Sequence, residues 1–424
     1  MKLFSLFLVL LTASLSHAAV WQSRNTWTPD SEKKFADFIE NRVHADIFVN
    51  PKSPYNGIST DCADAIYVLR AIFAYENELQ FAMRESGGGG KLITSNMTKW
   101  DSLSPEKRLR SFLTFVRLAG TTQTLPNDTY PIEINKTYVT PGVVFLNTEL
   151  SGSSDMGHVE FVKSIDVTGY LSFMSSTAPE AIRKLNTTMV NTIAPQNTSS
   201  GFRRFKQPQD YAKNVKDLPG YSTEQFRLAD WTPKKLSARL EIFKWHEAVR
   251  NRLRDRVPTL NESMGFLTTN ICNLLRSRVP IVKTAWDKLQ SRGGQCFADA
   301  GDDYDNYSTP ERDTRIFDNY ALLEELLKIQ DPRTQGERIV DMVRSRRGTG
   351  QGPVAPRAKN EAYDMSKAKD ILQACQVEYS PGEFVDAYQL YRVTKSGHLE
   401  SDPNYNIRVR WGVELPERVH QDCR

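Results

Sequence analysis

The feature that most constrains the fold is a helix that begins with a cysteine. Residues 59–79, "STDCADAIYVLRAIFAYENEL", predict a helix with Asp61 as its N-cap and Cys62 in its first turn. Apolar residues recur at helical spacing on the side of the cysteine, so we expect the helix to pack on a core. These residues are Ile66, Leu69 and Phe73.

The electrostatic surroundings of Cys62 act in opposite directions. The partial positive charge of a helix N-terminus favours a thiolate. Asp61 and Asp64 oppose it, so the sequence does not decide the direction of the pKa shift. Cys62 is therefore either a nucleophile or a small buried apolar residue at a helix start.

A thiol nucleophile requires a base, and His158 is the candidate. It is the second residue of the segment 157–179, "GHVEFVKSIDVTGYLSFMSSTAP", in which two predicted strands flank a turn at residues 166–169. A two-residue turn pairs Ile165 with Tyr170 and sets the register of the whole hairpin. The alternative interpretation of His158 is a half-buried strand histidine bonded to a carbonyl group.

The predicted register places four polar residues on one face of the hairpin. These are His158, Glu160, Ser175 and Thr177. The residue that orients the imidazole is expected among the last three, with Ser175 and Glu160 as the main candidates. A slip of one residue would bring in Ser176 instead.

The order of these elements resembles the papain-like cysteine peptidases over residues 50–180. "TDCADAIYVLRAIFA" is similar to the cysteine helix of transglutaminase-core peptidases and to the Asp-Cys-Ser/Ala helix opening of NlpC/P60 cell-wall peptidases. "TPGVVFLN" and "GHVEFVKSID" resemble the strand pair of the NlpC/P60 group. The resemblance implies that Cys62 is the nucleophile and His158 the general base. It also implies an oxyanion-hole side chain six residues before the cysteine, where Asn56 stands.

The third member of the site departs from the family pattern. These families commonly place Asp, Asn or His on the strand after the histidine, whereas this chain has serine and threonine there. A hydroxyl such as that of Ser175 can orient an imidazole but stabilises an imidazolium less than a carboxylate does. Glu160 could supply the charge from the neighbouring position.

The N-terminal residues determine how the five cysteines are interpreted. Residues 1–18 combine Lys2 with a short apolar run and small residues, which predicts a signal peptide removed after Ala18. Cysteines of an exported protein tend to pair, and Cys62 lies far from the others and is expected to be free. The remaining four are expected to form two disulfides with three possible connectivities: Cys272, Cys296, Cys375 and Cys423.

A chain of 424 residues exceeds one ordinary core, so we expect two domains and an α+β fold. A papain-like domain over residues 19–210 would pack the core helix on an antiparallel sheet. A mainly helical, disulfide-stapled domain would follow over residues 220–424. Residues 384–412 predict a small hairpin at its end.

Composition and motifs exclude several classes of function. A formal charge of +4, with no basic face or tail, is not that of a nucleic-acid-binding protein. The mature chain has no apolar run long enough to cross a bilayer. "HEAVR" has Arg250 where a zinc-binding helix needs a second histidine, and no segment has calcium-loop spacing. We therefore expect no cofactor and no metal.

Two functions remain. The first is an exported cysteine hydrolase that cleaves a peptide or amide bond, with cell-wall peptides as the substrate that the resemblance implies. The alternative is a non-catalytic exported binding or structural protein on the same fold, favoured by the missing third residue and the large helical region. The sequence gives no indication of the oligomeric state.

Overall fold

The computed structural model describes residues 19–86, 90–148, 157–189, 194–195, 197–227, 238–298, 301–329 and 365–415. The predicted signal peptide and Cys423 lie outside the described residues. The fold is mixed α and β with an antiparallel sheet, which confirms the predicted fold class at this coarse level.

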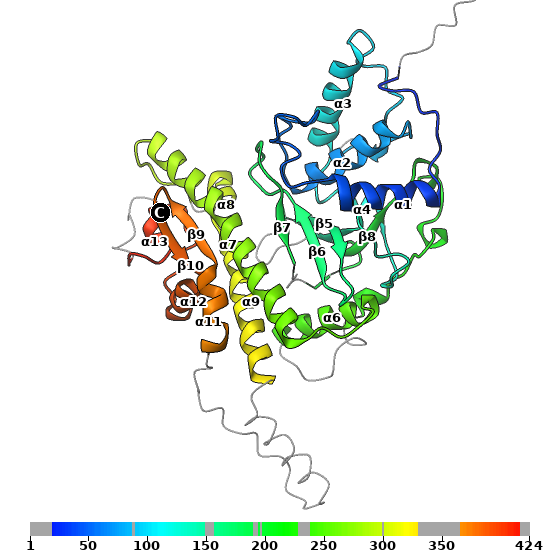
Figure 1. The fold of residues 1–424 in the computed structure, drawn as a ribbon. Coiled ribbons are helices and arrows are strands. Elements are labelled where there is room, and N and C mark those ends of the chain that lie inside the picture. Colours follow the sequence, from blue (N-terminus) through cyan, green and yellow to red (C-terminus); the bar gives the residue numbers. More distant parts are fainter. Residues whose placement is uncertain are drawn as a thin grey trace, which may run out of the picture.

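A six-stranded antiparallel sheet forms the framework of the N-terminal part (Figure 1). Its strand order is β3-β8-β4-β5-β6-β7, so β4 and β5 lie at the centre. The strands are β3 (Thr129–Pro131), β4 (Val144–Asn147), β5 (His158–Ile165), β6 (Leu171–Ser175), β7 (Asn186–Thr188) and β8 (Gly201–Phe205). His158 is therefore the first residue of a central strand.

The predicted cysteine helix is the central helix of the core. Helix α2 (Cys62–Glu76) begins at the N-cap Asp61, whose carboxylate accepts from the backbone N–H of Asp64, as expected. All residues from Cys62 to Ala74 are buried, so the helix is covered on every side rather than along one stripe. A helix with apolar side chains on all of its faces has to be covered by other parts of the protein on all of these faces.

The sheet and three neighbouring helices provide the cover around α2. The helices are α1 (Pro29–Asp37), its π-helical continuation (Phe38–Arg42) and α3 (Pro105–Ala119). The one cation in the middle of α2, Arg70, is bound to Glu32 through both of its terminal nitrogens and stacks on Trp27. Shorter elements in this part are β1 (Ala82–Arg84), β2 (Leu92–Thr94) and α4 (Leu125–Asp128), with 3-10 turns at Pro208–Asp210, Val215–Asp217 and Glu224–Phe226.

The hairpin β5–β6 differs from the prediction at its turn. Ile165 pairs with Leu171, one residue beyond the predicted partner Tyr170. The prediction of a two-residue turn is therefore wrong. A register shift within β5 compensates, and Phe161 pairs with Met174 in the predicted register. The extra residue of a β-bulge has no clear sequence signal. Because of this residue, the strand positions near His158 face the side of the sheet that was predicted for them.

The other face of the sheet is covered by α6 (Ala238–Leu253). Its Trp245 is fully buried and packs against Phe145 and Phe202. This helix comes from the region that we expected to belong to the second domain. The sheet is thus enclosed between α2 and α6.

The C-terminal part is mainly helical, with one small hairpin. Its elements are α7 (Leu260–Ser291), α8 (Asp302–Tyr307), α9 (Pro310–Ile329), α11 (Ser366–Ala374), β9 (Gln376–Ser380), β10 (Glu383–Asp386), α12 (Ala387–Ser396) and α13 (Ile407–Arg410). The predicted position of the hairpin is wrong, because most of residues 384–412 lie in or between α12 and α13. Asp386 caps α12 and Gly397, at φ 75°, ends it, so the capping signals outweigh strand propensity here.

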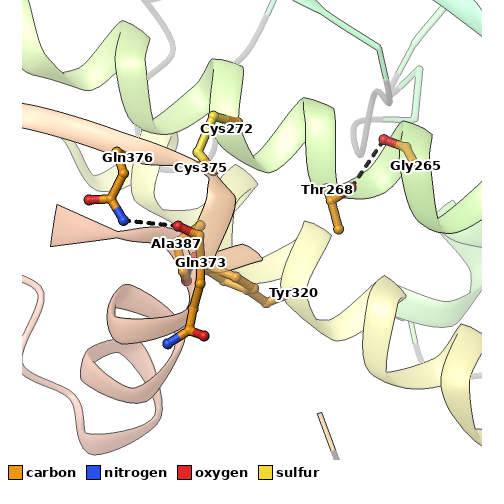
Figure 2. Close-up of a disulfide and its surroundings, with 8 residues drawn as sticks. All are labelled: Gly265, Thr268, Cys272, Tyr320, Gln373, Cys375, Gln376 and Ala387. Atoms are coloured by element: carbon orange, nitrogen blue, oxygen red, sulfur yellow. Dashed lines mark hydrogen bonds between the residues drawn. A yellow bond between two sulfur atoms is a disulfide. The ribbon is translucent and has the colours of Figure 1, made fainter. Parts of the chain in front are cut away.

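One predicted disulfide is present, between Cys272 of α7 and Cys375 at the end of α11 (Figure 2). This bond selects one of the three connectivities. Cys296 is also disulfide-bonded, and Cys62 is a free, buried thiol. A disulfide is typical of a non-reducing compartment.

Within the part of the chain that the structure describes, no helix combines the length and the apolar character needed to cross a membrane.

Candidate functional site

Cys62 lies where α2 meets strand β5. Its thiol is buried and makes backbone hydrogen bonds with Val159 and Ala63. Because Val159 directly follows His158, this contact brings the cysteine to the start of the strand that carries the histidine. Two residues separated by almost a hundred positions in sequence thus come to the same end of the sheet.

Burial raises the pKa of the Cys62 thiol to about 12, and the negative charge of Asp61 adds to this effect. The hydrogen bonds from Val159 and Ala63 lower the pKa by less. Asp64 is also affected, because burial and Asp61 raise its pKa to about 7. The opposing effects that the sequence left open therefore favour the protonated thiol at neutral pH.

Iodoacetamide should therefore alkylate Cys62 slowly in the native protein. A thiol of pKa 12 is ionised to about one part in 10⁴ at pH 8, against about one part in ten for pKa 9, so the native rate should be roughly 10³ times lower. Because the native pKa is raised, the rate should still increase tenfold per pH unit at pH 10. Mass spectrometry of the Cys62 peptide, with a urea-unfolded sample as control, measures both rates. A rate that reaches a plateau below pH 8 would contradict the burial argument.

His158 is partly buried at the start of β5, and its imidazole faces a carboxylate. Its Nε2 lies 3.6 Å from Oε1 of Glu160, an ion-pair distance rather than a hydrogen bond. Asn147 of β4 pairs with His158 across the strands, so both side chains occupy one face of the sheet. The Oδ1 atom of Asn147 is buried and has no hydrogen-bond donor among the described residues.

Glu160 is the most strongly held residue of the site. Its Oε1 accepts from Nη2 of Arg315 and from Oγ1 of Thr188, each at 3.0 Å. Burial by itself would raise the pKa of Glu160, but the charge of Arg315 and the interaction with His158 outweigh it and hold the pKa well below its usual range. A fixed negative charge therefore lies beside the imidazole at neutral pH.

Among the described residues, the other predicted candidates form no hydrogen bond with Nε2 of His158. Ser175 is buried in β6 and pairs with Asn186, and no hydrogen bond joins it to His158 in the described ranges. Thr177 accepts from Nη2 of Arg312. Ser176, the alternative for a slipped register, donates to the carbonyl oxygen of Thr60. Of the candidates for the orienting residue, the structure brings Glu160 to the imidazole.

Asn56, the predicted oxyanion donor, lies in a turn before α2. Its backbone carbonyl accepts from Nη1 of Arg110, which ties this turn to α3. Within the described residues, no hydrogen bond links its side chain to Cys62. The geometry therefore gives no support to a role for Asn56 in the site.

Three residues of the site were missed at the level of sequence. Asn147 ends the strand "TPGVVFLN", and the antiparallel register that places His158 also places Asn147 opposite it. Thr188 lies on the edge strand β7, which carries no strong strand pattern. Arg315 belongs to α9 and comes 155 residues after Glu160, so no local pattern could have found it.

No cluster of three or more His, Cys, Asp or Glu side chains in the described ranges could hold a metal ion. Comparisons with protein-family models, with curated proteins and with solved structures found no match to this chain.

Proposed function

We propose that the protein is an exported cysteine hydrolase that cleaves a peptide or amide bond, with Cys62 as nucleophile and His158 as base. The observation that carries this proposal is the His158–Glu160 pair, 3.6 Å apart, at the strand end where the thiol of Cys62 contacts Val159. The disulfide supports a non-reducing compartment. Cell-wall peptide is the substrate class that the resemblance to NlpC/P60 peptidases suggests.

The chemistry would resemble that of a hydroxyl nucleophile, because the thiol is protonated at rest. Its Sγ attacks the carbonyl carbon while His158 accepts the thiol proton, and Glu160 stabilises the imidazolium. The imidazolium then donates this proton to the leaving nitrogen, the C–N bond breaks and a thioester forms. Water hydrolyses the thioester and restores the thiol. In the first turn of α2 the N–H of Asp64 already donates to Asp61 and that of Ala63 to the Cys62 thiol, so the backbone N–H of Cys62 is the candidate for binding the oxyanion.

The decisive experiment compares site variants on two substrates, purified bacterial cell-wall sacculi and fluorescently labelled casein. Cys62→Ala and His158→Ala should each reduce peptide release by at least about a thousandfold, since the two residues act as a unit. His44→Ala is the matched control, because His44 is exposed and precedes the site. Release is measured by mass spectrometry of soluble fragments. No release by the unaltered protein, or full release by Cys62→Ala, would refute the hydrolase.

A non-catalytic binding protein is the second candidate, and the state of Cys62 favours it. A thiol that is buried and has a pKa of about 12 is a poor nucleophile unless a base acts on it. In this case the protein would sediment with sacculi without releasing peptides, and Cys62→Ala would sediment equally well. The same preparations therefore discriminate between the two functions.

A further inference from the structure

Helix α9 brings two arginines to the strand ends around His158. Arg315 donates from Nη2 to Oε1 of Glu160 at 3.0 Å. One turn earlier, Arg312 donates from Nη2 to Oγ1 of Thr177 at 2.6 Å and to the carbonyl oxygen of Ala178 at 3.2 Å. The helical part of the chain thus contacts the sheet at the residues next to the proposed site, not at a remote surface.

A line of buried hydrogen bonds fixes the turn of α9 that carries Arg315. Asn319 donates to the carbonyl oxygen of Arg315 at 2.8 Å, and Asn270 of α7 donates to Oδ1 of Asn319 at 2.9 Å. The backbone N–H of Met189, directly after β7, donates to Oδ1 of Asn270 at 2.6 Å. Both asparagines are fully buried, where loss of an amide partner is costly. This line sets the position of α9 relative to the edge of the sheet.

Three groups meet at a single carboxylate oxygen. Oε1 of Glu160 accepts from Arg315 and Thr188, and the same oxygen is the one 3.6 Å from Nε2 of His158. The two donors hold this oxygen in place, and Nε2 of His158 is buried without a hydrogen-bond partner among the described residues. A change in the hydrogen bonds that Arg315 and Thr188 donate to Glu160 therefore changes the surroundings of the His158 imidazole.

We propose that Arg315 is a positioning residue of the Cys62–His158 site, supplied by the helical half, which holds Glu160 so that its carboxylate orients the imidazole. This inference rests on the proposed function and adds that one site is built by both halves of the chain. Removing the guanidinium takes away a positive charge and a donor from Oε1. The imidazole can then approach the oxygen, and the His158–Glu160 pair binds a proton more tightly.

Arg315 is the cation that acts on Glu160 beside His158, and the other titratable groups near this site lie on α9, at the start of α2, on α3 as Arg117, and at Arg183. Helix α9 contributes cations and α2 contributes the thiol and two carboxyl groups, while β4 and β7 contribute only neutral side chains at this point. The residues are Arg312 and Arg315; Cys62, Asp61 and Asp64; and Asn147 and Thr188.

The test is a pH titration of the His158 imidazole by ¹⁵N NMR in the full chain. Arg315→Met should raise the apparent pKa of the His158–Glu160 pair by about one pH unit or more, and Arg315→Lys should keep it near that of the unaltered protein. Lys283→Met controls for the loss of one charge, because Lys283 is exposed on α7 and paired with Asp287. If Arg315→Met does not fold, Arg315→Gln replaces it, since its amide still donates without a charge. An unchanged titration in the neutral variant would overturn the proposal.

The rate of substrate hydrolysis by the Arg315 variants is a second and independent test of the proposal. Arg315→Met should lower kcat at least tenfold with little change in KM, and Arg315→Lys should restore part of it. Unchanged kcat in Arg315→Met, despite a shifted titration, would also overturn the positioning role. The titration needs no substrate, so a protein that hydrolyses nothing would refute the proposed function and leave the link between Arg315 and His158 to be judged by NMR.

Discussion

Asp313→Ala should lower the free energy of unfolding by about 3–5 kcal/mol, because it leaves a buried guanidinium without its counter-ion. Arg278 donates to both carboxylate oxygens of Asp313, at 2.7 and 3.2 Å. The two side chains are 0% and 2% exposed. Hydroxyl groups of Thr309 and Ser401 donate to the same carboxylate at 2.8 Å, so the substitution also removes their acceptor.

Urea unfolding measures this effect, and the exposed pair on α7 provides its control. Asp287→Ala breaks the ion pair with Lys283, whose side chains are more than half exposed, and should cost less than about 1 kcal/mol. Replacing both Arg278 and Asp313 by apolar residues should recover only part of the loss, since the buried guanidinium of Arg410 also interacts with the charge of Asp313. If Asp313→Ala were as stable as Asp287→Ala, the buried ion pair would have no structural role.

The second large effect should come from the disulfide of Figure 2. The bond joins residues 103 positions apart, and a loop of this length predicts a stabilisation of up to about 4.7 kcal/mol through the unfolded state. The double variant Cys272→Ala/Cys375→Ala should therefore unfold at markedly lower urea concentration. It isolates this bond from that of Cys296, which a reductant would also break.

The measurement follows helical circular dichroism during urea unfolding. Cys62→Ala is the control, because it removes a buried sulfur without removing a crosslink. Unchanged midpoints in the double variant, with the bond shown by mass spectrometry to be present in the parent protein, would mean that packing alone holds α7 against α11. An intermediate shift would fit the lower part of the known range of disulfide contributions.

Local rules predicted the parts of the site that depend on neighbours in sequence. The cap at Asp61, the helix start at Cys62 and the strand start at His158 follow from short patterns. Alternation along one strand was enough to place Glu160 on the face of His158, even though the turn of the hairpin was wrong.

What could not be predicted depends on tertiary contacts. The direction of the thiol pKa shift depends on how deeply α2 is covered, which the sequence does not state. The cation for Glu160 comes from another helix, and α6 covers the sheet through Trp245, although its sequence pattern says only that it is amphipathic. Burial and long-range pairing, rather than propensity, decide these features.

The distance in sequence between Glu160 and Arg315 also has a consequence in time. Ribosomes add about 5–20 residues per second, so the 155 residues between these two positions take roughly 8–30 s to synthesise. During this interval the residues of β5 have been synthesised, but the arginine that binds Glu160 has not. The surroundings of His158 therefore cannot take their final form until α9 has been synthesised.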